Sequence, residues 1–270
     1  MNIPFKKLSG AGNDFIVIDN RHNSIEFSTE TIKALCTRRT GIGADGLILI
    51  EASQSADFTM KYYNSDGLLG SMCGNGGRCA AYFAYNSGVP TQKPNEYLFE
   101  ANGNYYHAWI VGKEQVKLQM NPSHDFKENL QVEGLLCYFL NTGSPHVVTY
   151  VDDVNIINVY EKGDAIRHRT DIFNGGTNVN FVQQTSANEL IIRTFERGVE
   201  DETLACGTGA VASALISHML GKTNSTSLNV TVRSGDTLQI SFTSDMENIY
   251  LSGPTKIIFS GTFEKTSSYA

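Results

Sequence analysis

The chain has 270 residues, 41% of them hydrophobic and 18% charged, with 21 Lys and Arg against 28 Asp and Glu. The resulting net charge of −7 argues against a dedicated nucleic-acid binder and against a basic protein of the membrane surface. This length is typical of two domains or one large domain, and it buries enough surface to fold without disulfides or structural metals.

The sequence lacks the patterns of a membrane span or a secretory signal. Its apolar runs are far shorter than the roughly 18–20 residues that cross a bilayer, and Lys6 and Lys7 are followed by a polar stretch rather than an apolar one. An odd number of cysteines at irregular spacing is no disulfide framework. We therefore expect a reduced, cytoplasmic protein in which Cys36, Cys79 and Cys137 are core residues.

Most of the chain is predicted to form short β-strands joined by turns. The candidate strands are rich in Val, Ile, Tyr, Phe or Thr and are bounded by Gly, Asn, Asp or Pro. They span residues 15–19, 47–51, 58–63, 105–111, 116–120, 147–151, 180–184, 190–195, 228–233, 237–242 and 257–263. Many strands joined by short turns favour mostly antiparallel sheets.

Three segments are predicted to be helical. Ser28 can cap a helix that continues to Arg39, with Gly41 beyond its end. The other two segments, 79–85 and 210–216, are almost free of charge on every side. A helix that is apolar all round is buried all round, so we expect a central helix wrapped by sheet, and we expect it twice.

The two apolar helices are preceded by similar sequences. The first follows Cys73-Gly74-Asn75-Gly76 and the second follows Cys206-Gly207-Thr208-Gly209, and Ala81 in the first is matched by Ala214 in the second. The offset is 206 − 73 = 133 residues, which is close to half of the chain. Two related halves, each with a cysteine at a Gly-rich helix start, are the simplest explanation.

A Cys-Gly-x-Gly helix start can bind a carboxylate and activate a thiol. The N–H groups and partial positive charge of the first helical turn attract anions and favour thiolate over thiol. A lone cysteine is more often an inert buried residue. Two such starts facing one cleft, however, would suit stereoinversion beside a carboxylate: one thiolate removes the α-proton and the opposite thiol protonates the other face. Such chemistry requires neither a metal nor an organic cofactor.

Eight separate motifs follow one another between residues 7 and 210. They span residues 7–15, 39–46, 64–67, 72–79, 143–146, 178–181, 196–198 and 205–210. Together they closely resemble the diaminopimelate epimerase family. The resemblance implies an α+β fold of two pseudo-symmetric domains, each a mostly antiparallel sheet around a central buried helix. It places residues 1–117 and 255–270 in an N-terminal domain with Cys73, and residues 118–254 in a C-terminal domain with Cys206, with the active site in the cleft between them.

The resemblance also implies the activity. The protein would be a cofactor-independent epimerase that interconverts LL-2,6-diaminopimelate and meso-diaminopimelate in lysine and peptidoglycan-precursor biosynthesis. Cys73 and Cys206 would be the catalytic acid and base, exchanging roles with the direction of reaction. Beyond this small-molecule substrate, the partner we consider is a second copy of the chain in a homodimer, and we expect no nucleic acid, metal or membrane.

The remaining site residues implied by the resemblance bind substrate or tune the thiols. The substrate-binding residues would be Asn13, Asn64, Gly74, Asn75, Asn178, Glu196, Arg197, Gly207 and Thr208. Arg197 suits the distal carboxylate, because a guanidinium grips a carboxylate with two hydrogen bonds. His146 and Glu196 would tune the thiol pKa values. From the residues alone, the favoured interpretation of His146 is a histidine at the edge of a strand with a backbone partner.

The sequence departs from the family pattern at a few positions. Gly46 stands where some members carry a substrate-binding Gln, and we expect it to admit water. Ser144 replaces an Asn before Pro-His, and the segment 196–206 is one residue longer than the pattern. We expect these changes to affect recognition of the distal end of the substrate more than the chemistry.

Other readings of the sequence have identifiable weaknesses. Residues 41–46 match the Gly-rich dinucleotide motif, but a helix precedes them and a strand follows, which is the reverse of the required order. A sibling racemase for proline, hydroxyproline or another amino acid remains an alternative, against which Arg197 speaks. A non-catalytic amino-acid binder is a second alternative, and the presence of both Cys-Gly-x-Gly motifs argues against it. A thiol redox protein is a third, and the lack of a C-x-x-C pair argues against it.

Overall fold

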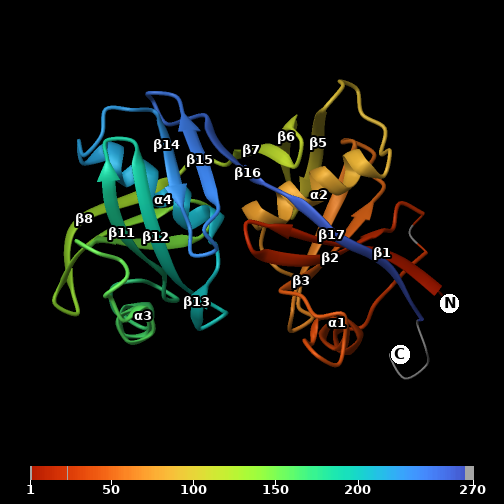
Figure 1. The fold of residues 1–270 in the computed structure, drawn as a ribbon, viewed down its shortest axis with the longest axis horizontal. Helices are drawn as coiled ribbons and strands as arrows, with labels where there is room; N and C mark the ends of the chain where they lie inside the picture. Colours follow the sequence, from red (N-terminus) through yellow and green to blue (C-terminus); the bar gives the residue numbers. More distant parts are fainter. Residues whose placement is uncertain (1, 23, 265–270) are drawn as a thin grey trace. The chain divides into compact units, whose positions relative to one another are not determined.

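A computed structural model describes residues 2–22 and 24–264 of the chain (Figure 1). The chain divides into two compact units, one formed by residues 1–118 with 254–270 and the other by residues 119–253. No helix in the described part of the chain is both long and apolar enough to span a membrane.

The first unit is a mixed sheet with strand order β17-β1-β2-β3-β4-β5-β6-β7. Its strands are β1 (Asn2–Gly10), β2 (Asn13–Asp19), β3 (Gly46–Glu51), β4 (Phe58–Asn64), β5 (Glu96–Ala101), β6 (Asn104–Gly112), β7 (Gln115–Met120) and β17 (Lys256–Glu264). The pairs β2–β3 and β4–β5 are parallel and the others are antiparallel. Helix α1 (Thr29–Cys36) connects the first parallel pair, and α2 (Gly74–Asn86) connects the second.

The second unit has strand order β8-β9-β10-β11-β12-β14-β15-β16, with β13 paired to the end of β12. Its strands are β8 (His124–Val132), β9 (Leu135–Asn141), β10 (Pro145–Tyr150), β11 (Asn178–Ser186), β12 (Glu189–Glu196), β13 (Asp201–Thr203), β14 (Ser227–Thr231), β15 (Thr237–Phe242) and β16 (Ile249–Pro254). The parallel pairs are β10–β11 and β12–β14. They are connected by α3 (Val159–Arg167) and α4 (Gly207–Met219).

The two units therefore repeat one topology. Starting from β17–β1 in one unit and β8–β9 in the other, parallel and antiparallel pairs follow in the same order, and each parallel pair is bridged by a helix. Thus α2 corresponds to α4, and β2, β3 and β4 correspond to β10, β11 and β12. The predicted α+β fold of two similar halves, each with a buried central helix, is confirmed.

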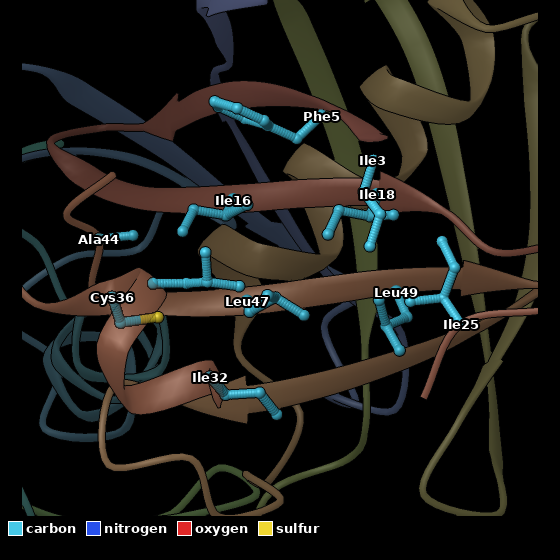
Figure 2. Packing of buried hydrophobic residues seen from close by; sticks show 11 residues of the cluster. Ile3, Phe5, Ile16, Ile18, Ile25, Ile32, Cys36, Ala44, Leu47 and Leu49 are labelled. Atoms are coloured by element: carbon cyan, nitrogen blue, oxygen red, sulfur yellow. The ribbon is translucent and has the colours of Figure 1, made fainter. Parts of the chain in front are cut away.

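The central strands of the first unit are covered on both faces. Ile48 of β3 points to α2, where its Cδ1 lies 3.5 Å from the position of a Cβ on Gly76. The alternate side chains face α1 instead and form a second core cluster (Figure 2). That cluster includes Ile3, Phe5, Ile16, Ile18, Ile32, Leu47 and Leu49. Burial on both faces explains why residues 15–18 and 47–50 are uninterrupted apolar runs.

The second unit has the same arrangement. Helix α4 packs on β9, β10, β11, β12, β14 and β15, as α2 packs on β1, β2, β3, β4 and β6 in the first unit. A cluster on the other face joins Val147, Val179 and Phe181 to Val159 and Ile166 of α3. The face of the sheet that carries α4 is therefore the face that orients side chains toward Cys206.

Several predicted boundaries need correction. Ser28 caps the first helix as predicted, but the helix ends at Cys36 rather than Arg39, because Thr37 is extended and Arg39 has a left-handed φ of 77°. The strand predicted over 228–233 ends at Thr231. The structure also contains elements that the sequence patterns do not predict, namely α3, β1, β5, β8, β9, β13 and β16.

The predicted core cysteines are confirmed. Cys36, Cys79 and Cys137 are buried and form no disulfide. The Gly-rich segment 41–46 follows α1 and leads into β3, so it lacks the strand-to-helix order of a dinucleotide-binding loop.

Candidate active site

Cys73 and Cys206 occupy the same position on corresponding helices. Each is the N-cap of a 13-residue helix, α2 or α4, and each has an extended backbone there. The carbonyl of Cys73 accepts from the N–H of Gly77 at 2.7 Å, and that of Cys206 accepts from Ala210 at 3.0 Å. The side chain of Cys73 also caps its helix, whereas that of Cys206 makes no cap hydrogen bond. Both residues nevertheless stand at a helix N-terminus, whose partial positive charge favours a thiolate or a bound carboxylate.

The sulfur of Cys73 has partners on both sides. It accepts from the N–H of Gly76 at 3.4 Å, and its thiol donates to Oδ1 of Asn13 at 3.6 Å. Asn13 begins β2, and its Nδ2 donates to Oδ2 of Asp45 at 2.6 Å. Because a carboxylate only accepts, Asp45 fixes the amide with its oxygen toward Cys73.

A cluster of charges holds Asn13 and Asp45 in place. Asp14 pairs with Lys7 at 2.8 Å and with Arg38 at 2.7 Å, and Arg38 also reaches Asp45 at 2.7 Å. Burial raises the pKa of Asp14, but hydrogen bonds from Arg38 and Lys7 outweigh it, so its pKa lies below the ordinary value. The cluster ties the start of β2 to the segment that leads into β3.

The sulfur of Cys206 faces a hydroxyl instead of an amide. Oγ1 of Thr208 lies 3.5 Å from this sulfur and 2.9 Å from Nε2 of His146. Oγ of Ser144 lies 2.9 Å from the same Nε2 and 3.3 Å from Oγ1 of Thr208. His146 in β10 thus reaches Cys206 through Thr208, with Ser144 as a third member of the group.

His146 is an uncharged member of this group. Its side chain is fully buried, and this burial, together with the positive charge of Arg197, lowers its pKa from 6.5 to about 3. A neutral imidazole cannot stabilise a thiolate by its charge, so any influence of His146 on Cys206 must pass through hydrogen bonds. The ring nitrogens contact side chains, and not the backbone partner expected for a structural histidine.

The other residues of the two helix starts are mostly buried. Gly74, Asn75 and Gly207 are buried, whereas Thr208 is half-buried. Thr142 holds this turn of α4 by donating from its hydroxyl to the carbonyl of Thr208 at 3.0 Å. A ligand at these positions would meet backbone N–H groups and one hydroxyl rather than charged side chains.

Three of the polar residues expected to bind substrate lie where strands begin or end. Asn64 ends β4, Asn178 begins β11 and Glu196 ends β12. Asn178 is anchored to backbone at both ends of its amide: Nδ2 donates to the carbonyl of Pro145 at 2.8 Å, and Oδ1 accepts from the N–H of Arg197 at 2.9 Å. Asn178 therefore positions Arg197 whether or not it also contacts a substrate.

Arg197 is a half-buried cation suited to an anionic ligand. Its Nη1 donates to the carbonyls of Gly175 and Gly176 at 3.4 and 3.5 Å, which are long hydrogen bonds. Burial and the charge of Arg167 lower its pKa, and within residues 2–22 and 24–264 it forms no ion pair. These carbonyls are uncharged acceptors, whereas a carboxylate is a charged acceptor that can bind two N–H groups of the guanidinium.

The positions that depart from the family pattern have structural explanations. A Cβ on Gly46 would lie 2.5 Å from Cε2 of Tyr62, so the tyrosine ring, and not the open space that we expected, lies against this glycine. Ser144 joins the group around His146, so its expected influence on the distal end is corrected to an influence beside Cys206. The longer segment 196–206 contains β13, which pairs with the end of β12.

One cluster has the geometry of a metal site. Ligand atoms of Asp164, His168 and Glu200 lie within 4.8 Å of one another. Arg167, however, already pairs with Glu200 at 2.9 Å, and the cluster lies at the surface. We read it as a surface ion-pair network rather than a metal centre.

Comparison with known sequences now identifies the chain. The family model described as diaminopimelate epimerase matches residues 5–124 and 138–258. A diaminopimelate epimerase of Chlorobaculum tepidum is 53% identical over 256 residues, which cover 94% of this chain and 99% of that protein. One of Flavobacterium psychrophilum is 45% identical over 260 residues, covering 95% and 98%. The chain belongs to the diaminopimelate epimerase family. It is thus an enzyme of the epimerase type, as predicted.

Solved structures agree with this family at the level of the fold. A probable proline racemase from Agrobacterium radiobacter K84 superposes with a TM-score of 0.75 at 13% identity, covering 98% of this chain and 93% of that one. A PhzF-family phenazine biosynthesis protein of Bacillus anthracis gives 0.72 at 14% identity, covering 98% and 99%. These likenesses support the two-part fold shared by the epimerase family and these proteins.

The structure adds residues to the site that the epimerase motifs did not single out. Asp45 orients Asn13, and Asn180 donates from Nδ2 to Nδ1 of His146 at 3.1 Å. Arg78 is fully buried in α2 and donates to the carbonyl of Gly74 at 3.3 Å. Each stands inside one of the eight motifs, but Asp45 and Asn180 act on residues of other segments, and only their distances to those residues show what they do.

Proposed function

We propose that this epimerase interconverts LL-2,6-diaminopimelate and meso-diaminopimelate with Cys73 and Cys206 as its catalytic acid and base. The observation that carries the proposal is the repeated helix start, with a cysteine as the N-cap of each central helix. Membership in the family supports the substrate, and the sulfur environments support the chemistry.

In the proposed reaction, one thiolate takes the proton from the α-carbon and becomes a thiol. The other thiol gives its proton to the opposite face of that carbon and becomes a thiolate, so one proton is removed and one is added. The reverse reaction exchanges the two roles. Both sulfurs must act on one α-carbon, and each single cysteine must therefore be indispensable.

The reacting carboxylate would bind at the helix starts. First-turn N–H groups of Gly74, Asn75, Gly207 and Thr208 would donate to it, and their hydrogen bonds would strengthen as negative charge develops in the transition state. This arrangement supplies the electrostatic stabilisation that a metal or organic cofactor supplies elsewhere, so we expect the enzyme to need neither.

The distal carboxylate of the substrate would be held by a cation, Arg197. Asn13, Asn64, Asn178 and Glu196 would bind other polar groups of the substrate. This assignment separates the protein from a racemase of small monocarboxylates, which have no distal carboxylate to bind. The enzyme would act in the cytoplasm, as a monomer or homodimer, in lysine and peptidoglycan-precursor biosynthesis.

The test is exchange of the α-hydrogen in heavy water. The wild-type protein should incorporate deuterium at the α-carbon of LL-diaminopimelate while forming the meso isomer. Cys73→Ala and Cys206→Ala should each abolish epimerisation and remain folded. Cys137→Ala, at a buried cysteine in β9, is the matched control and should keep its activity.

Three outcomes would contradict the proposal. Substantial turnover by either cysteine variant would exclude the two-thiol mechanism. Binding of diaminopimelate without deuterium incorporation would indicate a binding protein. Faster racemisation of proline than of diaminopimelate would favour the sibling racemase.

A further inference from the structure

Two buried polar side chains behind His146 have no part in the proposed chemistry. Asn180 in β11 is fully buried and Thr194 in β12 nearly so, and they are cross-strand partners. Oγ1 of Thr194 donates to Oδ1 of Asn180 at 2.9 Å. Nδ2 of Asn180 donates to the carbonyl of Val147 at 2.8 Å and lies 3.1 Å from Nδ1 of His146.

These contacts determine which nitrogen of His146 carries the proton. The carbonyl of Val147 can only accept, so the nitrogen end of the Asn180 amide must face it. The same Nδ2 then presents a hydrogen to Nδ1 of His146, which must accept. A neutral imidazole has one N–H, and here that N–H is on Nε2.

The position of this proton decides what Thr208 can do. With Nε2 as a donor toward Ser144 and Thr208, the hydroxyl of Thr208 keeps its own proton for the sulfur of Cys206, 3.5 Å away. In the opposite tautomer, two N–H groups would face each other at Asn180. Nε2 would then accept a hydroxyl proton, and Thr208 would be a candidate to lose its proton to it.

The second glycine of the α4 motif fits the same arrangement. A Cβ on Gly209 would lie 2.2 Å from Oδ1 of Asn180. Only a residue without a side chain lets the first turn of α4 pass so close to this amide. The helix start that carries Cys206 is thus built against Asn180.

We infer that Asn180 and Thr194 are positioning residues for Cys206: they hold His146 as the Nε2–H tautomer, which directs the hydroxyl proton of Thr208 to the sulfur and favours its thiolate. The inference rests on the proposed role of Cys206, but the hydrogen-bond chain can be tested without turnover. The charged group that acts on His146 is Arg197, whose positive charge disfavours a second positive charge on the imidazole.

The first measurement is the tautomer of His146, from the nitrogen resonances of protein labelled with ¹⁵N-histidine and assigned with His146→Gln. Wild type should show the Nε2–H form. Asn180→Ala and the milder Thr194→Val should shift the population toward Nδ1–H, whereas Thr194→Ser, which retains the hydroxyl, should restore it. An Nδ1–H form in wild type, or no change in either variant, would overturn the inference.

The second measurement is the pKa of the Cys206 thiol, from the ultraviolet absorbance of its thiolate after subtraction of the same protein with Cys206→Ser. A lost hydrogen bond to a charged group should raise this pKa by about one unit in Asn180→Ala and in Thr208→Val. The double variant should show little further rise, because both changes interrupt one chain. Burial raises the pKa of Cys36 to about 12 and that of Cys137 to about 11, so these thiols do not interfere near neutral pH.

Additive effects of Asn180→Ala and Thr208→Val, or an effect of Thr208→Val alone, would overturn the chain from Asn180 to the sulfur. Failure of the proposed function has a different signature. If Cys206→Ala retained turnover, the catalytic role would fall while the tautomer and pKa results stood.

Discussion

The two helix starts share a fold, a motif and a cysteine, yet they surround the sulfur with different chemistry. Cys73 donates to an amide oxygen that Asp45 holds in place, within a cluster of charged side chains. Cys206 meets the hydroxyl of Thr208, in a network of neutral side chains around His146. In both units the side chains that contact the sulfur, directly or through Thr208, come from the first residues of corresponding strands, β2 and β10. The repeat thus fixes which elements supply the neighbours of each sulfur, and the sequence of each half decides whether the sulfur faces an amide oxygen or a hydroxyl.

The strongest asymmetry between the halves is the cation after β12. Arg197 follows the end of β12, and the corresponding residue after β4 is Ser65. Removing one partner of a closed carboxylate–Arg pair costs roughly 3–5 kcal/mol, which is on the order of a hundred- to several-thousand-fold in kcat/KM. Arg197→Met should therefore reduce kcat/KM for LL-diaminopimelate by at least about two orders of magnitude.

Ser65→Ala is the matched control for Arg197→Met, and it should change kcat/KM little. Lysine, which has one carboxylate, is the comparison substrate. The wild-type protein should racemise lysine poorly. If wild type racemised lysine nearly as well as diaminopimelate, or if Arg197→Met kept diaminopimelate activity, recognition of the distal carboxylate by Arg197 would be wrong.

The halves should also respond differently to acid. The imidazole of His146 titrates near 6.5 when exposed but near 3 when folded, so between these values the unfolded state binds more protons. Lowering the pH from 6.5 to 4.5 should therefore cost about 2–3 kcal/mol of unfolding free energy from this group. Asp14 in the first unit behaves differently, because its pKa is lowered from 3.8 and its contribution is lost only below that pH.

Urea titrations at pH 6.5 and 4.5 measure this difference. The change in unfolding free energy should be much smaller in His146→Gln than in wild type. Asp14→Asn should leave the change between these two pH values as it is in wild type. An unaltered pH dependence in His146→Gln would show that the imidazole is not held neutral.

Corresponding glycines of the two motifs should differ in tolerance to a methyl group. At Gly209 a Cβ would collide with Asn180, whereas at Gly76 the nearest atom is the flexible Cε of Met60 at 3.3 Å. Gly209→Ala should cost about 1–3 kcal/mol of stability through overpacking. Gly76→Ala should be neutral or stabilising by up to about 1 kcal/mol, since Ala is the better helix former. Equal urea midpoints of the two variants would contradict the close approach at Gly209.

The elements found from the sequence are those whose burial leaves a simple pattern. Residues 47–50 are buried on both faces and read as a strand. Strand β8 was missed because most of its side chains are exposed, and β1 because Pro4, Lys6 and Lys7 interrupt its apolar pattern. Helix α3 was missed because Gly163 lies inside it. In the structure, a Cβ on Gly163 would lie only 2.3 Å from Cβ of Phe195.

The candidate site shows the same limit. The cysteines and their helix starts were predictable because a short local sequence defines a helix N-terminus. The roles of Ser144 and Asn180 were not, because each depends on a partner in another segment. Oγ of Ser144 meets Nε2 of His146 two residues along the chain, but it also meets Oγ1 of Thr208 on α4, and no spacing along the chain encodes that second meeting.

The pairing of β17 with β1 has a consequence for how the chain is made. Asn2 pairs with Glu264 across nearly the whole length of the chain, while residues 119–253 form the second unit as one continuous segment. During synthesis the second unit is therefore complete before the first, whose β1 waits with an open hydrogen-bonding edge for the last strand to emerge. Such long-range pairing is slow and leaves an unpaired edge open to other chains in the meantime. The half of the molecule that is translated first is thus the half that finishes folding last.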